Sequence, residues 1–340
     1  MSKNPMVVFV APKKVVIEDR PMPAAGPAQV LVKSERTLIS TGTELTILKS
    51  EFAARSAWAD YGRLPFVPGY DNVAKVLEVG PGVDKGLVGK RVASFAPHSA
   101  FAAVPVAETW VIPEKVTSDE AVFFTIAQIV FNGVRRGQAA WGETAIVYGL
   151  GLLGQITVRA LLFAGVRPVF AVDVADKRLA LLPKHEGLVA LNPKKSSVRE
   201  TVSKHTRGRM ADVVYEVTGA PSLIPQEFEA LKPLGRFVVL SSPSGKTEFD
   251  FHDLCNAPSF VIIGAHNASH PEHETPYNQW TKSRDAELYF GLVAKREIEV
   301  DSLVSHREPY TKAPELYAAL LADRSQAMGV VLEWDVEGRV

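Results

Sequence analysis

Apolar and polar positions follow one pattern in the first third of the chain and another in its centre. Up to about residue 117, short apolar runs alternate with turns rich in Pro and Gly. No long amphipathic helix separates the first three runs, which predicts a mostly antiparallel β domain in the form of a partly open barrel. We expect a helix over residues 46–58 and strands over 6–10, 15–18, 29–34, 72–79, 91–95 and 102–105.

From about residue 118 to 263, apolar runs alternate with segments of helical periodicity. Ser118 is expected to cap a helix that runs to Gly137, with Glu120 in its first turn. This alternation predicts an α/β protein with a doubly wound parallel sheet of the Rossmann type. Strands are expected near Thr144, Val169, Leu188, Asp212, Gly235 and Phe260, and helices over 151–164, 175–182, 195–204 and 221–231. After a polar loop, we expect helices near 284–294 and 312–321 and a last strand over 329–334.

The predicted strand near Thr144 runs directly into a motif with the spacing G-x-G-x-x-G. Its glycines are Gly149, Gly151 and Gly154, and the apolar residues that follow recur at helical spacing. A strand-to-helix turn of this kind lets the backbone approach a pyrophosphate, which the first N–H groups of the helix can bind. The sequence therefore predicts a dinucleotide site, and the start of the helix adds Leu152 and Leu153 to it.

Asp173 ends the next predicted strand, where a carboxylate can accept hydrogen bonds from the adenosine ribose. Because this carboxylate would repel the 2′-phosphate of NADP, the sequence favours NAD. Lys177 and Arg178 follow closely and leave NADP open, since an arginine here can bind that phosphate. Thr218 and Ser241 end later strands on the ligand side and are expected to contact the cofactor.

Composition excludes several classes of partner and site. Among 340 residues, Lys plus Arg and Asp plus Glu number 38 each, so nothing indicates a nucleic-acid or acidic-membrane partner. The single cysteine, Cys255, excludes an internal disulfide and a multi-cysteine zinc site. Residues 1–6 lack the apolar core of a signal peptide, and no apolar run reaches membrane-spanning length. We therefore expect a cytoplasmic protein.

Three motifs resemble those of the medium-chain dehydrogenase/reductase superfamily. Residues 66–80, FVPGYDNVAKVLEVG, are similar to its P-x-x-x-G-H-E-x-x-G-x-V-x-x-V-G signature, and residues 87–92, LVGKRV, to its V-G-D-R-V. Residues 39–44, ISTGTE, stand where zinc-dependent members carry Cys followed by Gly-[ST]-[DE]. The resemblance implies a GroES-like β-barrel catalytic domain over 1–117, a Rossmann domain over 118–283, and a C-terminal segment over 284–340 that returns to the catalytic domain.

The same motifs depart from the zinc-dependent members at the metal ligands. Thr41 replaces the ligand Cys and Tyr70 the ligand His, and the central helix over 125–132 offers neither Cys nor Glu. The four-cysteine structural zinc lobe is also absent. The resemblance thus implies a zinc-independent member without a metal site, most similar in motifs to the group of bacteriochlorophyllide a dehydrogenase. We do not carry over the pigment substrate of that group.

Without zinc, a side chain must take the hydroxyl proton when an alcohol is oxidised. Tyr70 is the first candidate for this acid/base role, with Glu44 or Asp71 as its charge partner. Alternatively, Tyr70 is a wall residue and the two acids satisfy backbone amides. His98, on a shortened loop, is a second candidate proton carrier because imidazole titrates near neutral pH.

The central helix carries candidate substrate contacts. Gln128 and Asn132 lie one helical turn apart, so their amides can face one direction, toward substrate hydroxyl groups or across a domain interface. By the resemblance, Thr41 and Tyr70 converge with this helix, which makes Thr41 a further candidate contact. The polar loop around Thr41 suits a polyhydroxylated substrate.

A polar loop over residues 266–280 follows the last predicted Rossmann strand and is expected to cover the nicotinamide and the substrate. We expect His266 to contact the cofactor and Asn267 and Trp280 to contact the substrate. Pro271 prevents one continuous helix through the three histidines of the loop, which disfavours metal binding there.

The sequence thus predicts a zinc-independent, NAD-dependent dehydrogenase/reductase that transfers a hydride between the nicotinamide and a secondary alcohol or ketone, such as a polyol or sugar derivative. The alternatives are an NADPH-dependent quinone or enoyl reductase, and a cofactor-binding protein without catalysis. The apolar run over 260–263 reads as an edge strand, and superfamily members commonly pair subunits there, so a homodimer is expected.

Overall fold

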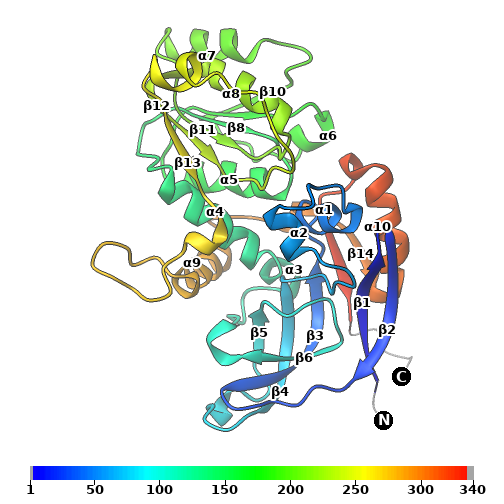
Figure 1. The fold of residues 1–340 in the computed structure, drawn as a ribbon. Coiled ribbons are helices and arrows are strands. Elements are labelled where there is room, and N and C mark those ends of the chain that lie inside the picture. Colours follow the sequence, from blue (N-terminus) through cyan, green and yellow to red (C-terminus); the bar gives the residue numbers. More distant parts are fainter. Residues whose placement is uncertain (1–2, 335–340) are drawn as a thin grey trace. The chain divides into compact units, whose positions relative to one another are not determined.

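The computed structural model describes residues 3–334, which form two compact units. The first unit contains residues 3–125 and 286–334, and the second contains residues 126–285 (Figure 1). The two divisions fall inside helices α4 (Phe124–Arg136) and α9 (Lys282–Ala294). The outer domain limits expected at residues 1 and 340 lie outside the described residues.

The second unit is built on a six-stranded parallel sheet with the order β10-β9-β8-β11-β12-β13. Its strands are β8 (Ala145–Tyr148), β9 (Val169–Val172), β10 (Leu188–Leu191), β11 (Ala211–Glu216), β12 (Leu231–Val239) and β13 (Val261–Gly264). All six predicted strands are confirmed, and the order is that of a doubly wound Rossmann sheet. The order reverses between β8 and β11, which is where such sheets bind ligands at the carboxyl ends of their strands.

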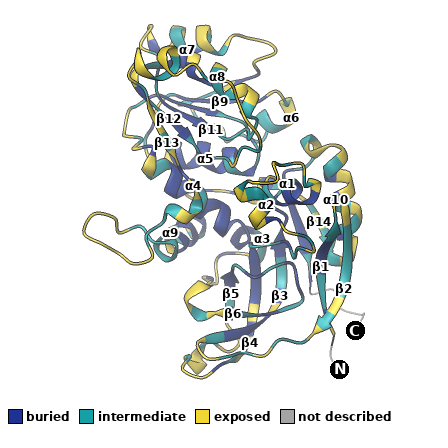
Figure 2. Ribbon diagram, viewed as in Figure 1, coloured by how far each residue is buried: buried dark blue, intermediate teal, exposed yellow. Residues whose placement is uncertain are grey.

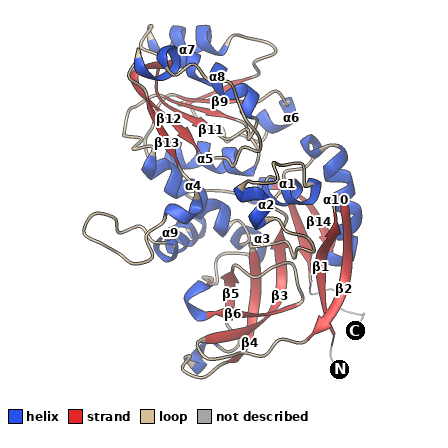
Figure 3. Cartoon of the chain, in the orientation of Figure 1, coloured by secondary structure: helices blue, strands red, loops and turns tan. Residues whose placement is uncertain are grey.

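Both faces of this sheet are covered (Figure 3). Ala145 and Val147 of β8 belong to one buried cluster, and Ile146 between them belongs to another. Successive side chains of a strand point to opposite faces, so two covered faces explain why the strand is wholly apolar. Figure 2 shows the central strands β9 and β11 as mostly buried. The helices of this unit besides α4 are α5 (Leu152–Phe163), α6 (Asp176–Leu179), α7 (Val198–Thr206) and α8 (Ile224–Glu227).

The first unit combines a two-stranded sheet with a mixed seven-stranded sheet. The strand path of the larger sheet is β14-β15-β3-β4-β5-β7, and β6 pairs with β3 beside that path. The first sheet contains β1 (Lys3–Ala11) and β2 (Lys14–Pro21); the second contains β3 (Gln29–Leu38), β4 (Asn72–Val79), β5 (Arg91–Ser94), β6 (Phe101–Pro105), β7 (Thr109–Val111), β14 (Val304–Pro309) and β15 (Gly329–Glu333). The helices are α1 (Thr43–Lys49), α2 (Ala57–Tyr61), α3 (Ser118–Ala121) and α10 (Ala313–Ala322). Antiparallel pairing of β15 with β3 joins the two parts of this unit.

Two predicted helices each divide into two, and the helix expected over 175–182 is shorter than predicted, since α6 ends at Leu179. The helix expected over 46–58 is two short ones, because Ser50 ends α1 in the left-handed conformation with φ of 54° and Ser56 caps the separate α2. The helix expected from Ser118 to Gly137 also divides into α3 and α4. Its cap is Thr117, one residue earlier than predicted, because Thr117 and Glu120 form a reciprocal capping box.

Among residues 3–334, no helix is long and apolar enough to cross a membrane.

Candidate active site

The glycine-rich turn joins β8 to α5 and depends on two of its glycines for packing. Gly149 has φ of +90°, and a side chain there would meet the Thr218 backbone nitrogen at 2.8 Å. A side chain at Gly154 would overlap the carbonyl oxygen of Gly149. These two positions hold the strand, the turn and the helix close together, as the motif predicts.

Gly151 has a different role, since it is the N-cap of α5 and a Cβ built there meets nothing within 4 Å. The backbone N–H groups of the first helical turn, including those of Leu152 and Leu153, have no partner within the helix. Open space beside unpaired N–H groups at the positive end of a helix fits a pyrophosphate. The residues present therefore fit a dinucleotide.

Asp173 follows β9 and ties that strand to the glycine-rich turn. Its Oδ2 accepts a hydrogen bond from Leu150 N at 2.8 Å, and its Oδ1 accepts one from Ala175 N at 2.8 Å. The Arg178 guanidinium lies 3.5 Å from Oδ2. Each carboxylate oxygen can accept a second hydrogen bond, so Asp173 can still receive ribose hydroxyl groups.

Glu216, at the end of β11, organises the opposite side of the turn and was missed in the sequence. Its Oε1 accepts hydrogen bonds from Thr218 N at 2.7 Å, Thr218 Oγ1 at 2.7 Å and Gly219 N at 2.9 Å. Its Oε2 accepts one from Ser241 Oγ. Thr218 and Ser241, predicted as cofactor contacts, thus direct their hydroxyl protons to Glu216. An acid at the carboxyl end of a predicted strand was the available signal.

Glu227 of α8 is a second buried acid in this region. Burial, and then the charge of Glu216, raises the pKa of Glu227 to about 9. At neutral pH, Glu227 is therefore a neutral acid.

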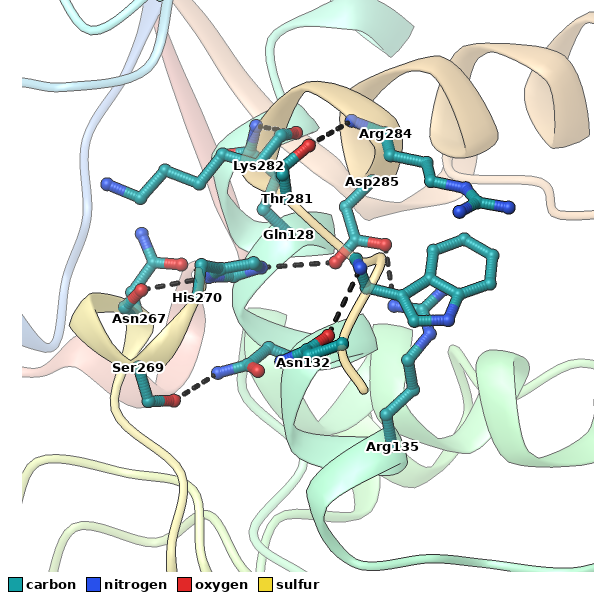
Figure 4. Close-up of polar contacts among 12 residues, drawn as sticks. Gln128, Asn132, Arg135, Asn267, Ser269, His270, Thr281, Lys282, Arg284 and Asp285 are labelled. Carbon is teal, nitrogen blue, oxygen red and sulfur yellow. Dashed lines mark hydrogen bonds and ion pairs between the residues drawn. The ribbon is translucent and has the colours of Figure 1, made fainter. Parts of the chain in front are cut away.

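Polar residues of α4 meet the segment over 266–285 within the second unit (Figure 4). Asn132 Nδ2 donates to His266 O at 3.2 Å and to Ser269 Oγ at 2.8 Å, and Gln128 Nε2 donates to Lys282 O at 2.9 Å. Four predicted site residues thus make hydrogen bonds between α4 and this segment or within it: Gln128, Asn132, His266 and Asn267.

Trp280, the last predicted substrate contact, is anchored by two arginines. The Arg135 guanidinium lies 3.5 Å from the Trp280 ring centroid, and that of Arg284 lies 4.3 Å from it. Between the turn Asn267–Ser269 and Trp280, residues 272–279 are exposed, as Figure 2 shows, and Tyr277 is 99% exposed. The segment is thus fixed at both ends and open to solvent at its tip.

Tyr70 lies in the first unit with two hydroxyl neighbours. Its hydroxyl forms a short hydrogen bond with Ser40 Oγ and lies 3.4 Å from Thr43 Oγ1. Burial, and then the charge of Asp71, raises the pKa of Tyr70 above its ordinary value. The phenol therefore keeps its proton at neutral pH.

Glu44 does not contact the Tyr70 hydroxyl but fixes the residue that does. Its Oε1 accepts a hydrogen bond from Ser40 N at 3.1 Å. Its Oε2 accepts one from Tyr317 of α10 and lies 3.3 Å from His98 Nε2. Glu44, His98 and Tyr317 are all buried.

Asp71 immediately precedes β4, contacts the first turn of α4 and is completely buried. Its Oδ1 accepts a hydrogen bond from Thr125 N at 3.2 Å, while Thr125 Oγ1 donates to Tyr70 O at 3.0 Å. Burial raises the pKa of Asp71 well above its ordinary value. These contacts favour the reading in which Asp71 satisfies a backbone amide and orients its neighbours. Thr41 lies on the same loop as Ser40 and is partly exposed.

Residues 153–283 match the sequence profile of a protein family. The family with this profile is the zinc-binding dehydrogenase family. Over 334 residues, the chain is 26% identical to L-threonine 3-dehydrogenase of Pyrococcus furiosus, covering 88% of this chain and 90% of that one. It is 24% identical over 266 residues to D-guloside 3-dehydrogenase of Escherichia coli K12, covering 76% and 75% of the two chains.

Solved structures of dehydrogenases share the fold. A short chain alcohol dehydrogenase of E. coli CFT073 in complex with NADH superposes with a TM-score of 0.80 at 19% identity, covering 98% of this chain and 100% of that one. A protein of Sinorhizobium meliloti 1021 bound to NADP, assigned as a zinc-binding dehydrogenase, gives 0.81 at 20% identity, with 98% and 100% covered. The fold is therefore an α/β dehydrogenase fold, and structures with this fold hold either cofactor.

The residues at the matched zinc positions do not fit the metal that names this family. Thr41 and Tyr70 offer hydroxyl groups, and residues 125–132 offer neither Cys nor Glu, whereas Zn²⁺ is bound by thiolate, imidazole and carboxylate groups. Among residues 3–334, no group of three or more His, Cys, Asp or Glu side chains could hold a metal ion.

Proposed function

We propose that this chain is a zinc-independent, NAD-dependent dehydrogenase that interconverts a secondary alcohol and a ketone. The observation that carries the proposal is the fit of the Gly149–Gly154 turn and Asp173 to a dinucleotide. The names of the relatives, both of them dehydrogenases, support the same reaction class. We also propose that the substrate is a small molecule and that the protein has no nucleic-acid or membrane partner.

In the oxidation, the alcohol carbon loses a hydride and its hydroxyl group loses a proton, which leaves a ketone. A nicotinamide dinucleotide would supply the hydride acceptor, and the backbone at Gly151, Leu152 and Leu153 would hold its pyrophosphate. In the reverse direction, Tyr70 donates its proton to the ketone oxygen. The raised pKa of Tyr70 keeps this proton in place until the oxygen becomes basic. Ser40 then stabilises the phenolate by donating a hydrogen bond to it.

Glu44 acts as a positioning residue in this scheme. It holds Ser40 through the backbone N–H, and Tyr317 and His98 hold the Glu44 carboxylate in turn. Because the carboxylate has three partners and is buried, Ser40 keeps one orientation toward Tyr70.

A polyol or a sugar derivative is the proposed substrate class, supported by the polar residues around Thr41 and by the D-guloside relative. The test is a turnover screen with NAD, a panel of sugar alcohols, and simple secondary alcohols as the reference. Reduction of NAD by at least one panel member is expected. If NADH binds and no panel member is oxidised, the chain is a cofactor-binding protein without this activity.

We predict that the protein binds NADH more tightly than NADPH, because the Asp173 carboxylate would face the 2′-phosphate. Asp173→Ser should narrow this difference in affinity, because it should weaken the binding of NADH and allow NADPH to bind. Fluorescence titration with both cofactors measures it. Arg178→Ala is the matched control. Removal of the neighbouring guanidinium should weaken the binding of NADPH and so widen the difference in affinity between the two cofactors. Equal affinities in the unchanged protein would contradict the NAD assignment and favour an NADPH-dependent quinone or enoyl reductase.

We also predict that the purified protein carries no stoichiometric zinc and that chelators leave its turnover unchanged. The reason is that Thr41 and Tyr70 stand at ligand positions and that the central helix over 125–132 lacks Cys and Glu. Elemental analysis checks the first part and an activity assay with and without chelator the second. One zinc per chain together with chelator-sensitive turnover would refute zinc independence.

A homodimer joined through the second unit is a further prediction. Strand β13 ends the sheet, and its Val261 and Ile262 are 50% and 43% exposed, so the edge can pair with a second copy. Light scattering should give a dimer mass at micromolar concentration, and Ile262→Lys should shift it toward the monomer. A monomer mass for the unchanged chain would count against this interface.

A further inference from the structure

A charged cluster in the second unit fixes the backbone of Asn267. Asp285 is completely buried and accepts hydrogen bonds from Arg135 Nη1 at 2.5 Å and from His270 Nε2 at 3.1 Å. The other ring nitrogen, His270 Nδ1, lies 2.8 Å from Asn267 O. Both nitrogens of His270 therefore lie within hydrogen-bond distance of acceptor oxygens. This cluster holds the 3₁₀ turn Asn267–Ser269 beside α4 (Figure 4).

Two amide side chains in this network have an oxygen that is buried and unpaired. Gln128 is completely buried, and its Nε2 donates to Lys282 O, yet its Oε1 has no hydrogen-bond partner among the described residues. Asn267 Oδ1 is also buried and has no partner among residues 3–334. A rotated Gln128 amide would place its oxygen against the Lys282 carbonyl oxygen, so the orientation is fixed. Buried acceptors without donors are rare and destabilising, which points to a ligand that supplies the donors.

The charges around these oxygens decide which donor fits. Among the residues labelled in Figure 4, the three cations Arg135, Lys282 and Arg284 outnumber the single carboxylate, Asp285. An ammonium group would be repelled by this excess of positive charge. A carboxylate or phosphate group would not fit either, because Gln128 Oε1 and Asn267 Oδ1 are acceptors and cannot donate a hydrogen bond to it. Neutral hydroxyl groups satisfy both conditions, because they donate a hydrogen bond and carry no charge.

We propose that Gln128 Oε1 and Asn267 Oδ1 form a subsite that accepts hydrogen bonds from hydroxyl groups of the substrate remote from the carbon being oxidised. The enzyme thereby selects a neutral polyhydroxylated alcohol over a simple alcohol or an amino alcohol. This inference rests on the proposed dehydrogenase function and adds the specificity-determining residues to it.

The test compares kcat/KM for D-sorbitol, 2-butanol and L-threonine in the unchanged protein and in Gln128→Met and Asn267→Leu. Both substitutions keep a similar volume and remove the acceptor oxygen. The unchanged protein should prefer sorbitol, and each variant should lose about tenfold with sorbitol while 2-butanol changes less than twofold, as expected for a lost hydrogen bond. Tyr277→Ser, on the exposed tip of the same segment, is the control and should behave like the unchanged protein.

Several outcomes would overturn the subsite. They are equal losses with sorbitol and 2-butanol, a preference for L-threonine, or a loss of NADH affinity in the variants, which would assign the two amides to the cofactor. Melting temperatures exclude misfolding, since removal of the unpaired Asn267 oxygen should not lower stability.

If the unchanged protein oxidises none of the three alcohols, the proposed function fails in that assay, and calorimetry of sorbitol with the NADH-loaded protein tests the subsite separately. Sorbitol binding that both variants lose supports the subsite, and no sorbitol binding overturns it.

Discussion

Tyr70→Phe is expected to lower kcat/KM by about 10²–10⁴, the usual contribution of a general acid or base. The variant removes only the hydroxyl oxygen that contacts Ser40 and Thr43, so the ring keeps its packing. Steady-state kinetics in both directions, together with NADH titration, measure the effect. NADH affinity should remain within about twofold, because the residues that fit the cofactor belong to the second unit.

The pH dependence separates a proton-transfer role of Tyr70 from a packing role. Because the pKa of Tyr70 is raised, its protonated form persists to high pH, so ketone reduction should stay level through neutral pH. Alcohol oxidation needs the deprotonated form and should accelerate as pH rises. Phe at position 70 should remove this dependence, whereas Thr46→Ala, which loses an exposed hydroxyl on α1, should retain it. A loss below threefold in kcat/KM would identify Tyr70 as a wall residue, and His98→Asn would be the next variant.

The second unit could be predicted closely from the sequence because its pattern is simple. A parallel strand with two covered faces must be apolar at every position, as Ala145, Ile146 and Val147 are, and glycine spacing marks the turn after it. Strand β14 was missed because its sequence, VSHREP, is mostly polar and it pairs with β15 at the end of the sheet path. This segment forms a strand because it pairs with β15, and not because its residues favour strands.

The contacts that organise the candidate site could not be predicted in the same way. Tyr317 meets Glu44 from 273 positions away, and neither periodicity nor a motif relates the two residues. Glu216 has a local signal, yet its four hydrogen bonds depend on where the chain returns at Ser241. Asp173 was predicted to receive the ribose, and its bonds to Leu150 and Ala175 emerge only once the turn is folded. Sequence spacing thus identified the chemical groups but not their partners.

Two alanine substitutions in the glycine motif should separate folding from cofactor binding. At Gly154, the added Cβ would overlap the Gly149 carbonyl oxygen, which belongs to backbone and cannot move without distorting the turn. Gly154→Ala is therefore expected to lower thermal stability by several degrees and to abolish NADH binding as a consequence.

Gly151→Ala should give the opposite combination. Gly151 has φ of −68° and ψ of −169°, which alanine adopts without strain, and its Cβ would meet nothing within 4 Å. The melting temperature should therefore remain near that of the unchanged protein. The methyl group would occupy space beside the N-terminus of α5, where a pyrophosphate must approach the backbone, so NADH affinity should fall by at least tenfold. Calorimetric unfolding and NADH titration of both variants measure the two effects. If Gly151→Ala binds NADH as well as the unchanged protein does, the turn does not hold the cofactor in the way that the open space above α5 indicates.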